Sequence, residues 1–223
     1  MENDTAKDDG QAQYVRAMGP DLGQLCHELR DDFDWLRRKW SEFQELYGKG
    51  QERIDLLNIS ASNFFYFLHR LLFEDAMMHL CRLTDRPQMQ DRETLTVRAL
   101  IEMISDPALK APVQIKLKEV MEYCLFARKW RNSRLAHTDL EILRDGHALA
   151  LPPVTSTSID GALKSIGDLL TLIEGNFGLP HFLLAGDPWG AKSLVYCLGK
   201  GKRAVDDEQE SWRLALKKVA PND

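Results

Sequence analysis

Residues 22–47 read LGQLCHELRDDFDWLRRKWSEFQELY, and their pattern sets the fold class. The apolar residues recur every three or four positions, the spacing that places side chains on one face of an α-helix. They are Leu25, Leu29, Phe33, Leu36, Trp40, Phe43 and Leu46 or Tyr47. The pattern predicts a long amphipathic helix that ends near Gly48.

The same spacing returns along the rest of the chain. It predicts further main helices at residues 54–80, 94–104, 112–137 and 158–177. Pro112 sits where a helix could start, Ser158 is a suitable N-cap, and Gly178 ends the helix that Ser158 begins. Two C-terminal helices are expected near residues 187–196 and 208–219, separated by a basic break at residues 199–203. The sequence therefore predicts an all-α protein, a helical bundle of four to five main helices with extra C-terminal helices.

Other segments depart from helical periodicity. Residues 1–12 are polar and charged, a composition that predicts a disordered tail. Residues 82–92 are polar and contain Pro87, which predicts a loop. Asp145-Gly146 precedes an alternating segment, so a small hairpin or turn is expected near residues 142–151. The expected organisation is a tail at 1–12, a bundle at 13–180, and a C-terminal extension at 181–223 packed on the bundle or on a partner.

Composition narrows the class of protein. The 223 residues are 44% hydrophobic, enough for a full core, yet no apolar run reaches the length of a membrane span. The four cysteines lie far apart and lack zinc-finger spacing, which favours a reducing compartment and no metal site. The net charge of −5 argues against a broad nucleic-acid surface. We expect a soluble cytoplasmic protein whose contacts with a polynucleotide are local.

The segment Arg131-Asn-Ser-Arg-Leu-Ala-His137 carries the most chemical information. On a helix, Arg131, Arg134 and His137 are spaced by three and form one slanting row. Arg presents a planar cationic fork that matches phosphate oxygens, and His exchanges protons near neutral pH. The same cations would also complement the negative end of a helix dipole, which needs no function. This combination of arginines and a histidine suits metal-free cleavage of RNA.

One histidine cannot easily serve as both general base and general acid in that reaction. An isologous dimer that packs two motif helices together would bring two His137 and two Arg131 side chains into one cleft. We therefore predict a homodimer through the motif helix.

The motif also resembles the signature of HEPN proteins, with Arg131, Asn132 and His137 in the Arg, polar and His positions. The order of elements strengthens this resemblance: a long helix, then residues 80–85 (LCRLTD), a polar loop, a short helix from Thr94, and a long helix ending in the motif. This arrangement is similar to the AbiU-like branch, which is associated with abortive phage infection, and it covers residues 22–177.

The resemblance implies a metal-independent endoribonuclease of a phage-defence or toxin–antitoxin system, with no cofactor. Arg131 and His137 would be catalytic, while Asn132 would orient the site and Arg134 would assist phosphate binding. RNA and an antitoxin or regulatory protein would be its partners. Asp139 stands where related toxins often carry a tyrosine, which argues against tyrosine modification.

A second hypothesis from a different class stays open. The same row of cations could belong to a non-catalytic HEPN-like module that binds a nucleotide, RNA or an acidic protein. Among other polar residues, His27, His69 and His79 lie beside apolar neighbours and are interpreted as structural. Glu74, Asp75 and Asp85 are interpreted as helical surface charge rather than as metal ligands.

Overall fold

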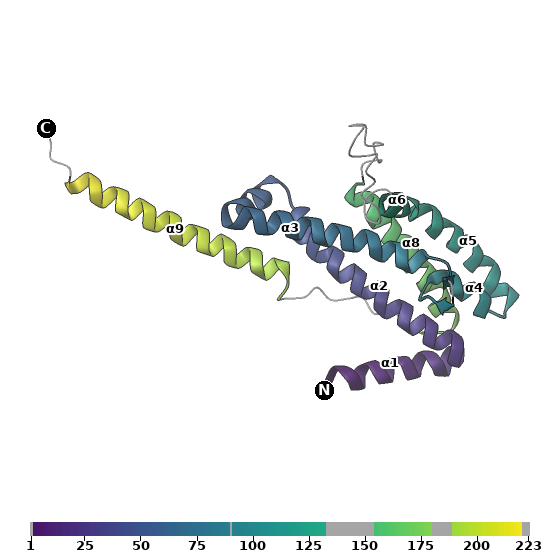
Figure 1. The fold of residues 1–223 in the computed structure, drawn as a ribbon. Coiled ribbons are helices and arrows are strands. Elements are labelled where there is room, and N and C mark those ends of the chain that lie inside the picture. The colour runs from purple at the N-terminus through teal and green to yellow at the C-terminus, as the bar shows by residue number, and fades with distance from the viewer. Residues whose placement is uncertain (1, 90, 133–153, 180–188, 220–223) are drawn as a thin grey trace, which may run out of the picture. The chain divides into compact units, whose positions relative to one another are not determined.

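A computed structural model of the protein describes residues 2–89, 91–132, 154–179 and 189–219. These residues are predominantly α-helical, which confirms the predicted fold class (Figure 1). The helices are α1 Glu2–Met18, α2 Pro20–Tyr47, α3 Gln51–Thr84, α4 Leu100–Met103, α5 Pro107–Tyr123, α6 Leu125–Trp130, α8 Ser156–Asn176 and α9 Ala191–Val219. The other elements are the strands β1 Gln88–Met89 and β2 Arg92–Glu93 and the 3-10 turn η1 Val97–Ala99. Within the described ranges, no helix has the length and apolar character required to cross a bilayer.

The chain divides into two compact units, and α2 and α3 contribute residues to both. The first unit is Met1–Lys39 with Phe73–Leu184, and the second is Trp40–Leu72 with Ala185–Asp223. The segment expected as a C-terminal extension thus belongs mainly to the second unit, together with residues 40–72 of the expected bundle.

The core of the first unit is made by the apolar faces that the sequence periodicity predicts. Helices α5 and α8 lie side by side along much of their length (Figure 1). Gly167 of α8 leaves room for a ring, because a Cβ there would lie only 3.3 Å from Cζ of Phe33. The fully buried side chains include Leu29, Phe33, Leu36, Met77, Leu80, Leu83, Val113, Val120, Ile159, Ile166 and Ile173.

A buried charge cluster ties α1, α2 and α8 together within the first unit. Glu174 of α8 is only 2% exposed. Its Oε1 accepts hydrogen bonds of 2.7 Å from the Tyr14 hydroxyl and of 2.7 Å from Nε of Arg30. The Arg30 Nη2 also pairs with Oε2. Burial and the negative charge of Glu174 both raise the pKa of Tyr14, so the hydroxyl stays a donor.

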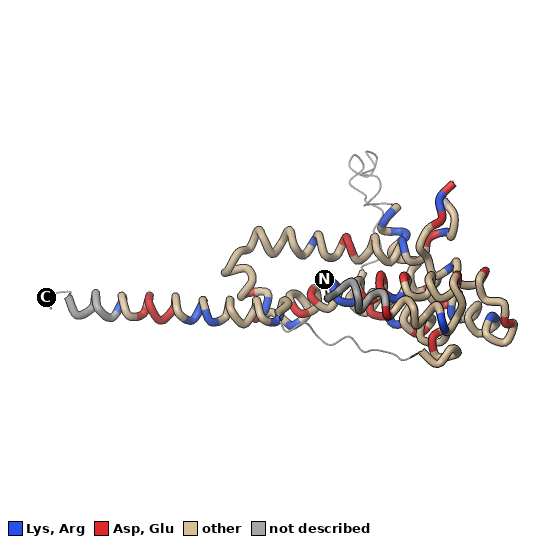
Figure 2. The backbone as a smooth tube through the Cα atoms, turned by 90° about the horizontal axis from the view of Figure 1, so that it is seen from below, with Lys and Arg blue, Asp and Glu red and all other residues tan. Residues whose placement is uncertain are grey.

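The second unit has a smaller core of its own. Leu46 of α2, Leu57 and Phe65 of α3, and Ala191 and Val195 of α9 are buried together. The Glu42 carboxylate accepts the backbone N–H of Ala191 at the first residue of α9, where the helix dipole favours a negative charge. Beyond this core, α9 carries a basic band followed by an acidic band (Figure 2).

Residues 2–12 belong to α1, so the prediction of a disordered tail at residues 1–12 differs from the structure. The reason is tertiary packing that composition does not show. Gly10 lies so close to His27 that a Cβ would come within 3.3 Å of its Nε2, and Tyr14 bonds to Glu174 one turn later.

A two-stranded hairpin lies inside the segment that the sequence predicts as a loop. β1 and β2 pair antiparallel, with Gln88 opposite Glu93 and Met89 opposite Arg92. The hairpin expected near residues 142–151 lies outside the described residues.

Two helix boundaries also differ from the predicted ones. α5 starts at Pro107 with Asp106 as its N-cap, so Pro112 lies inside the helix rather than at its start. α9 runs through Gly199–Arg203 without the expected break. A hydrogen bond of 3.2 Å from Nε of Arg203 to the Gly199 carbonyl and an ion pair between Lys202 and Asp206 support the helix across its two glycines.

Candidate functional site

Arg131 lies directly after α6, within the helix that the sequence predicts over residues 112–137. A break at Cys124, with φ of −90° and ψ of 0°, separates α6 from α5. Arg131 itself keeps helical angles of −55° and −50°, and its N–H donates to the carbonyls of Ala127 and Arg128. Arg131 therefore continues the helical backbone of α6, a short helix distinct from α5.

The guanidinium of Arg131 is held by a carboxylate from the end of α3. Nη1 of Arg131 lies 2.9 Å from Oδ1 and 2.8 Å from Oδ2 of Asp85. The two side chains are 25% and 19% exposed, so the pair is largely shielded from water. The hydrogen bond to Asp85 raises the pKa of Arg131, which keeps the guanidinium charged. Both contacts to Asp85 are made by Nη1, one of the three guanidinium nitrogens of Arg131. A guanidinium carries five N–H donors in all.

The position of Asp85 is fixed by the segment that follows the hairpin. The Thr96 hydroxyl bonds to the backbone carbonyls of Leu83 at 3.1 Å and Asp85 at 2.9 Å. Its oxygen also accepts the N–H of Arg98, which makes Thr96 the N-cap of η1. Thr96 is completely buried. The Thr96 side chain thus forms hydrogen bonds with backbone carbonyls at the end of α3 and also caps the 3-10 turn η1.

Arg128 reinforces the same junction. Its Nη2 donates to the backbone carbonyl of Thr84, the last residue of α3, and lies 3.6 Å from Sδ of Met121. Cationic side chains at a helix C-terminus complement the partial negative charge there. Arg128 and Arg131 together therefore fasten the end of α6 to the end of α3.

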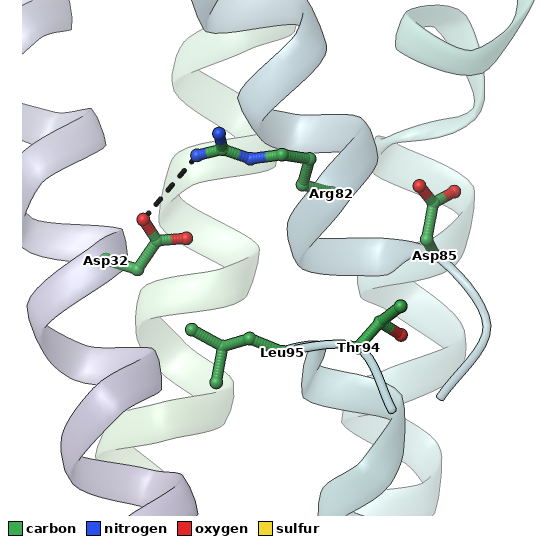
Figure 3. A pocket seen from close by; sticks show the side chains of 5 residues that line it. All are labelled: Asp32, Arg82, Asp85, Thr94 and Leu95. Carbon is green, nitrogen blue, oxygen red and sulfur yellow. Dashed lines mark ion pairs between the residues drawn. The ribbon is translucent and has the colours of Figure 1, made fainter. Parts of the chain in front are cut away.

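Asp85 also lines an adjacent pocket of about 440 Å³ (Figure 3). Its other lining residues are Asp32, Arg82, Thr94 and Leu95. The Arg82 side chain reaches toward Asp32 from α3, with Nη2 at 3.6 Å from Oδ1. The pocket thus combines both signs of charge with the apolar side chain of Leu95, and Asp85 joins it to Arg131.

A buried histidine connects to this pocket through Asp32. Nε2 of His79 lies 2.9 Å from Oδ2 of Asp32, and Nδ1 lies 3.1 Å from Nζ of Lys39. Lys39 in turn pairs with Asp75. Burial raises the pKa of Asp32, but His79, Arg82 and Lys39 outweigh burial and hold this pKa below its ordinary value. His79 is 1% exposed, so it serves packing and polar pairing inside the fold.

The two other histidines interpreted as structural lie in similar surroundings. His27 is buried and meets the Tyr14 ring edge-on at 5.5 Å. His69 packs against the rings of Phe43 at 5.0 Å and Tyr47 at 4.8 Å. Burial lowers the pKa of His69, which favours a neutral ring.

Of the four site residues that the sequence predicts, Arg131 and Asn132 are described by the structure. Asn132 is exposed and directly follows Arg131. Arg134 and His137 lie outside the described residues. The structure thus places one end of the motif and brings Arg131 to Asp85.

Asp85 is the residue that sequence reasoning missed. From the sequence it is interpreted as helical surface charge, although it ends the segment Leu80–Asp85 that supports the family resemblance. Its signal in the sequence is its place at the end of a long predicted helix, at the close of the segment that supports the family resemblance. Across residues 2–89, 91–132, 154–179 and 189–219, no group of three or more His, Cys, Asp or Glu residues is placed to hold a metal ion.

Comparison with known proteins finds one family. The family model HEPN_AbiU2, described as AbiU2, matches residues 19–183, which is more than half of the chain. The matched range includes Asp85, Arg131 and the whole predicted motif. No curated protein and no solved structure matches the chain.

Proposed function

Because the chain belongs to the AbiU2 family of HEPN proteins, we propose that it is a metal-independent endoribonuclease of a phage-defence or toxin–antitoxin system. The observation that carries this proposal is the Arg131 guanidinium, held charged and directed by Asp85 at the start of the motif. A phosphate-binding cation that is oriented before substrate arrives stabilises a developing charge without reorganising.

The proposed reaction needs only proton transfer and charge stabilisation. The ribose 2′-oxygen attacks phosphorus as its proton passes to a His137 imidazole, and the bond from phosphorus to the 5′-oxygen breaks. The leaving 5′-oxygen takes a proton from a second imidazole, and a 2′,3′-cyclic phosphate remains. Arg131 and Arg134 stabilise the negative charge on the phosphorus oxygens, and Asn132 orients the site.

The need for two imidazoles supports a homodimer through the motif helix. In an isologous dimer each protomer contributes one His137, so base and acid come from different chains. We also propose a cytoplasmic location, RNA as the substrate and an antitoxin or regulatory protein as a partner.

The test is cleavage of a mixed cellular RNA pool in excess EDTA. The wild type is expected to leave 2′,3′-cyclic phosphate ends, and His137→Ala and Arg131→Ala are expected to lose the activity. Lys129→Ala is the matched control, because Lys129 is an exposed cation of α6, two residues before Arg131. It is expected to cleave like the wild type.

Retained cleavage in His137→Ala would overturn the proposed mechanism. Binding of RNA or of an acidic protein by all variants, with cleavage by none, would instead establish the non-catalytic module.

A further inference from the structure

The pocket that Asp85 lines also contains an ion pair that can bind further groups. Nη2 of Arg82 lies 3.6 Å from Oδ1 of Asp32, a separation longer than a hydrogen bond. The Arg82 side chain is 60% exposed and the Asp32 side chain is 26% exposed. Both side chains line the pocket. The guanidinium and the carboxylate therefore keep hydrogen-bonding capacity for a ligand there.

Asp32 is held in place on its other side by a buried residue. Nε2 of His79, which is 1% exposed, lies 2.9 Å from Oδ2 of Asp32. Burial raises the pKa of Asp32, but His79, Arg82 and Lys39 together hold it below its ordinary value. Asp32 thus offers the pocket a charged acceptor, beside the donors of Arg82.

The pocket has the size and the lining of a small-ligand site. Its volume of about 440 Å³ falls in the range of about 300–1,000 Å³ that is typical of such sites. Leu95, which is 38% exposed, adds an apolar wall. Arg82 and Leu95 extend toward the side on which Asp32 lies, and Asp85 lies at the opposite side (Figure 3). A fitting ligand has an apolar face and a polar edge, and it reaches toward Asp85.

The polar edge that fits Arg82 and Asp32 carries two acceptors followed by two donors. An arginine fork matches two neighbouring acceptors, and a carboxylate matches two neighbouring N–H groups. Guanine presents N7 and O6 as acceptors, and then N1–H and N2–H as donors. Adenine and cytosine place an amino donor where guanine has O6, and uracil has one N–H between two acceptors. Guanine is therefore the RNA base that complements this pair best.

We propose that this pocket binds a guanine base of the substrate RNA, in the nucleotide next to the scissile phosphate. Arg82 donates to O6 and N7, Asp32 accepts from N1–H and N2–H, and the ring packs on Leu95. Asp85 lines the same pocket and contacts Arg131, so the pocket adjoins the guanidinium that is proposed to stabilise the phosphate. Because the base uses its Watson–Crick edge, this nucleotide is unpaired.

Binding of an uncleavable oligomer to the full chain tests the proposal. The probe is a fluorescent single strand of 2′-deoxyuridine with one central 2′-deoxyguanosine, which lacks the attacking 2′-oxygen. In fluorescence anisotropy it is expected to bind about tenfold more tightly than strands with adenine, cytosine or uracil at the central position. Equal binding of the four strands, or binding of none, would overturn the proposal.

Base analogues assign the contacts to the two side chains. Replacing guanine by 7-deazaguanine removes N7, and replacing it by hypoxanthine removes the N2 amino group, so both changes are expected to weaken binding to the wild type. In Arg82→Ala the loss caused by 7-deazaguanine is expected to disappear, while the loss caused by hypoxanthine remains. Asp32→Asn is expected to show the converse. A loss that is unchanged in both variants would contradict the assignment.

A matched control separates the pocket from general electrostatic attraction. Arg92 is an exposed cation of β2 that does not line the pocket. Arg92→Ala is expected to keep the guanine preference and both analogue effects. Circular dichroism of each variant checks that its helices are intact. Loss of the guanine preference in folded Arg92→Ala would also contradict a site at Arg82 and Asp32.

This inference rests on the proposed nuclease for its substrate, but its test does not require cleavage. A guanine preference in binding without any cleavage of RNA would leave the pocket assigned and the nuclease refuted. Cleavage of RNA without a guanine preference would support the nuclease and refute the pocket. The two failures are therefore distinguishable.

Discussion

Asp85 changes what Arg131 can do. A free arginine side chain samples many rotamers, whereas the two contacts to the Asp85 carboxylate restrict Nη1 of Arg131 to one place. The carboxylate also offsets the positive charge that a phosphate would meet. Asp85 is therefore expected to improve the orientation of the Arg131 guanidinium and to lower the affinity of Arg131 for a phosphate.

Asp85→Asn tests this balance. An amide keeps the shape of the side chain but loses its charge, so Arg131 is held less firmly. In the EDTA assay kcat is expected to fall about tenfold or more, because loss of alignment is costly in catalysis. Affinity for RNA is expected to stay equal or to increase. Asp91 is exposed in the nearby hairpin, so Asp91→Asn serves as the control. Weaker RNA binding with unchanged kcat would contradict this role.

The four thiols are expected to differ sharply in reactivity. Burial raises the pKa of Cys26 and of Cys124 to about 12 and that of Cys81 to about 11, whereas Cys197 is exposed. The thiolate is the reactive form. In native protein at neutral pH, a maleimide should label Cys197 alone, as peptide mass spectrometry would show. Labelling of Cys124 without denaturant would contradict the packing around the break at Cys124.

Local sequence could predict only part of the candidate site. The spacing of Arg131, Arg134 and His137 and the resemblance to HEPN proteins pointed to this helix end. Asp85 could not be assigned, because its partner lies 46 positions away and helical periodicity carries no information on which helix ends meet. The predicted roles of Arg134 and His137 stay predictions.

At the scale of elements, periodicity predicted the long helices well but not their ends. α2 and α8 follow their apolar spacing because one face of each is buried. The boundaries of α5 and α9 depend on competing local signals, since Pro107 and Pro112 both suit a helix start and Gly199 suits a break. Packing and side-chain bonds decide between such signals, and neither appears in a local pattern.

Glycines in different backbone states should respond oppositely to alanine. Gly199 is helical, and a Cβ there would meet Leu56 at an ordinary distance of 3.9 Å. Gly199→Ala is expected to stabilise α9 by about 1 kcal/mol. Gly50, between α2 and α3, has φ of +92°, so Gly50→Ala is expected to destabilise by about 1 kcal/mol. Urea unfolding and amide hydrogen exchange would measure both changes, and equal signs would contradict the assignment.

The buried cluster of Tyr14, Arg30 and Glu174 should dominate the attachment of α8 to α2. Arg30→Ala removes the guanidinium that neutralises a 2% exposed carboxylate, and the expected cost is about 3–5 kcal/mol in the free energy of unfolding. Tyr14→Phe removes one hydrogen bond to the same carboxylate, at about 1 kcal/mol. Urea denaturation of both variants checks the order. A smaller effect for Arg30→Ala would show that Glu174 is not held as a charged group.

At the scale of the whole molecule, the two units have separate cores. The first gathers around α5 and α8, and the second around Leu46, Leu57 and Phe65 with the start of α9. The residues of the candidate site that the structure describes, Asp85, Arg131 and Asn132, all belong to the first unit. Damage to the second core should therefore leave the surroundings of Arg131 folded.

Val195→Asp tests that separation. It places a charge in the second core, where Val195 is 9% exposed, and burial of an unpaired charge is strongly unfavourable. Hydrogen exchange is expected to rise in residues 40–72 and 191–198, while α5 and α8 stay protected. Lys192→Asp, at a neighbouring exposed position, is the control. Equal loss of protection in α5 and α8 would show that the chain unfolds as a single cooperative unit.

The composition of the second core also has a consequence for how the chain is made. Phe65 of α3 packs in the same core as Ala191 of α9, which lies 126 positions later in the chain. A ribosome that adds about 5–20 residues per second needs roughly 6–25 s to synthesise the residues between them. Leu46, Leu57 and Phe65 face solvent or a chaperone during that interval. Newly synthesised chains are thus expected to be most prone to aggregation, and most dependent on chaperones, just before α9 emerges.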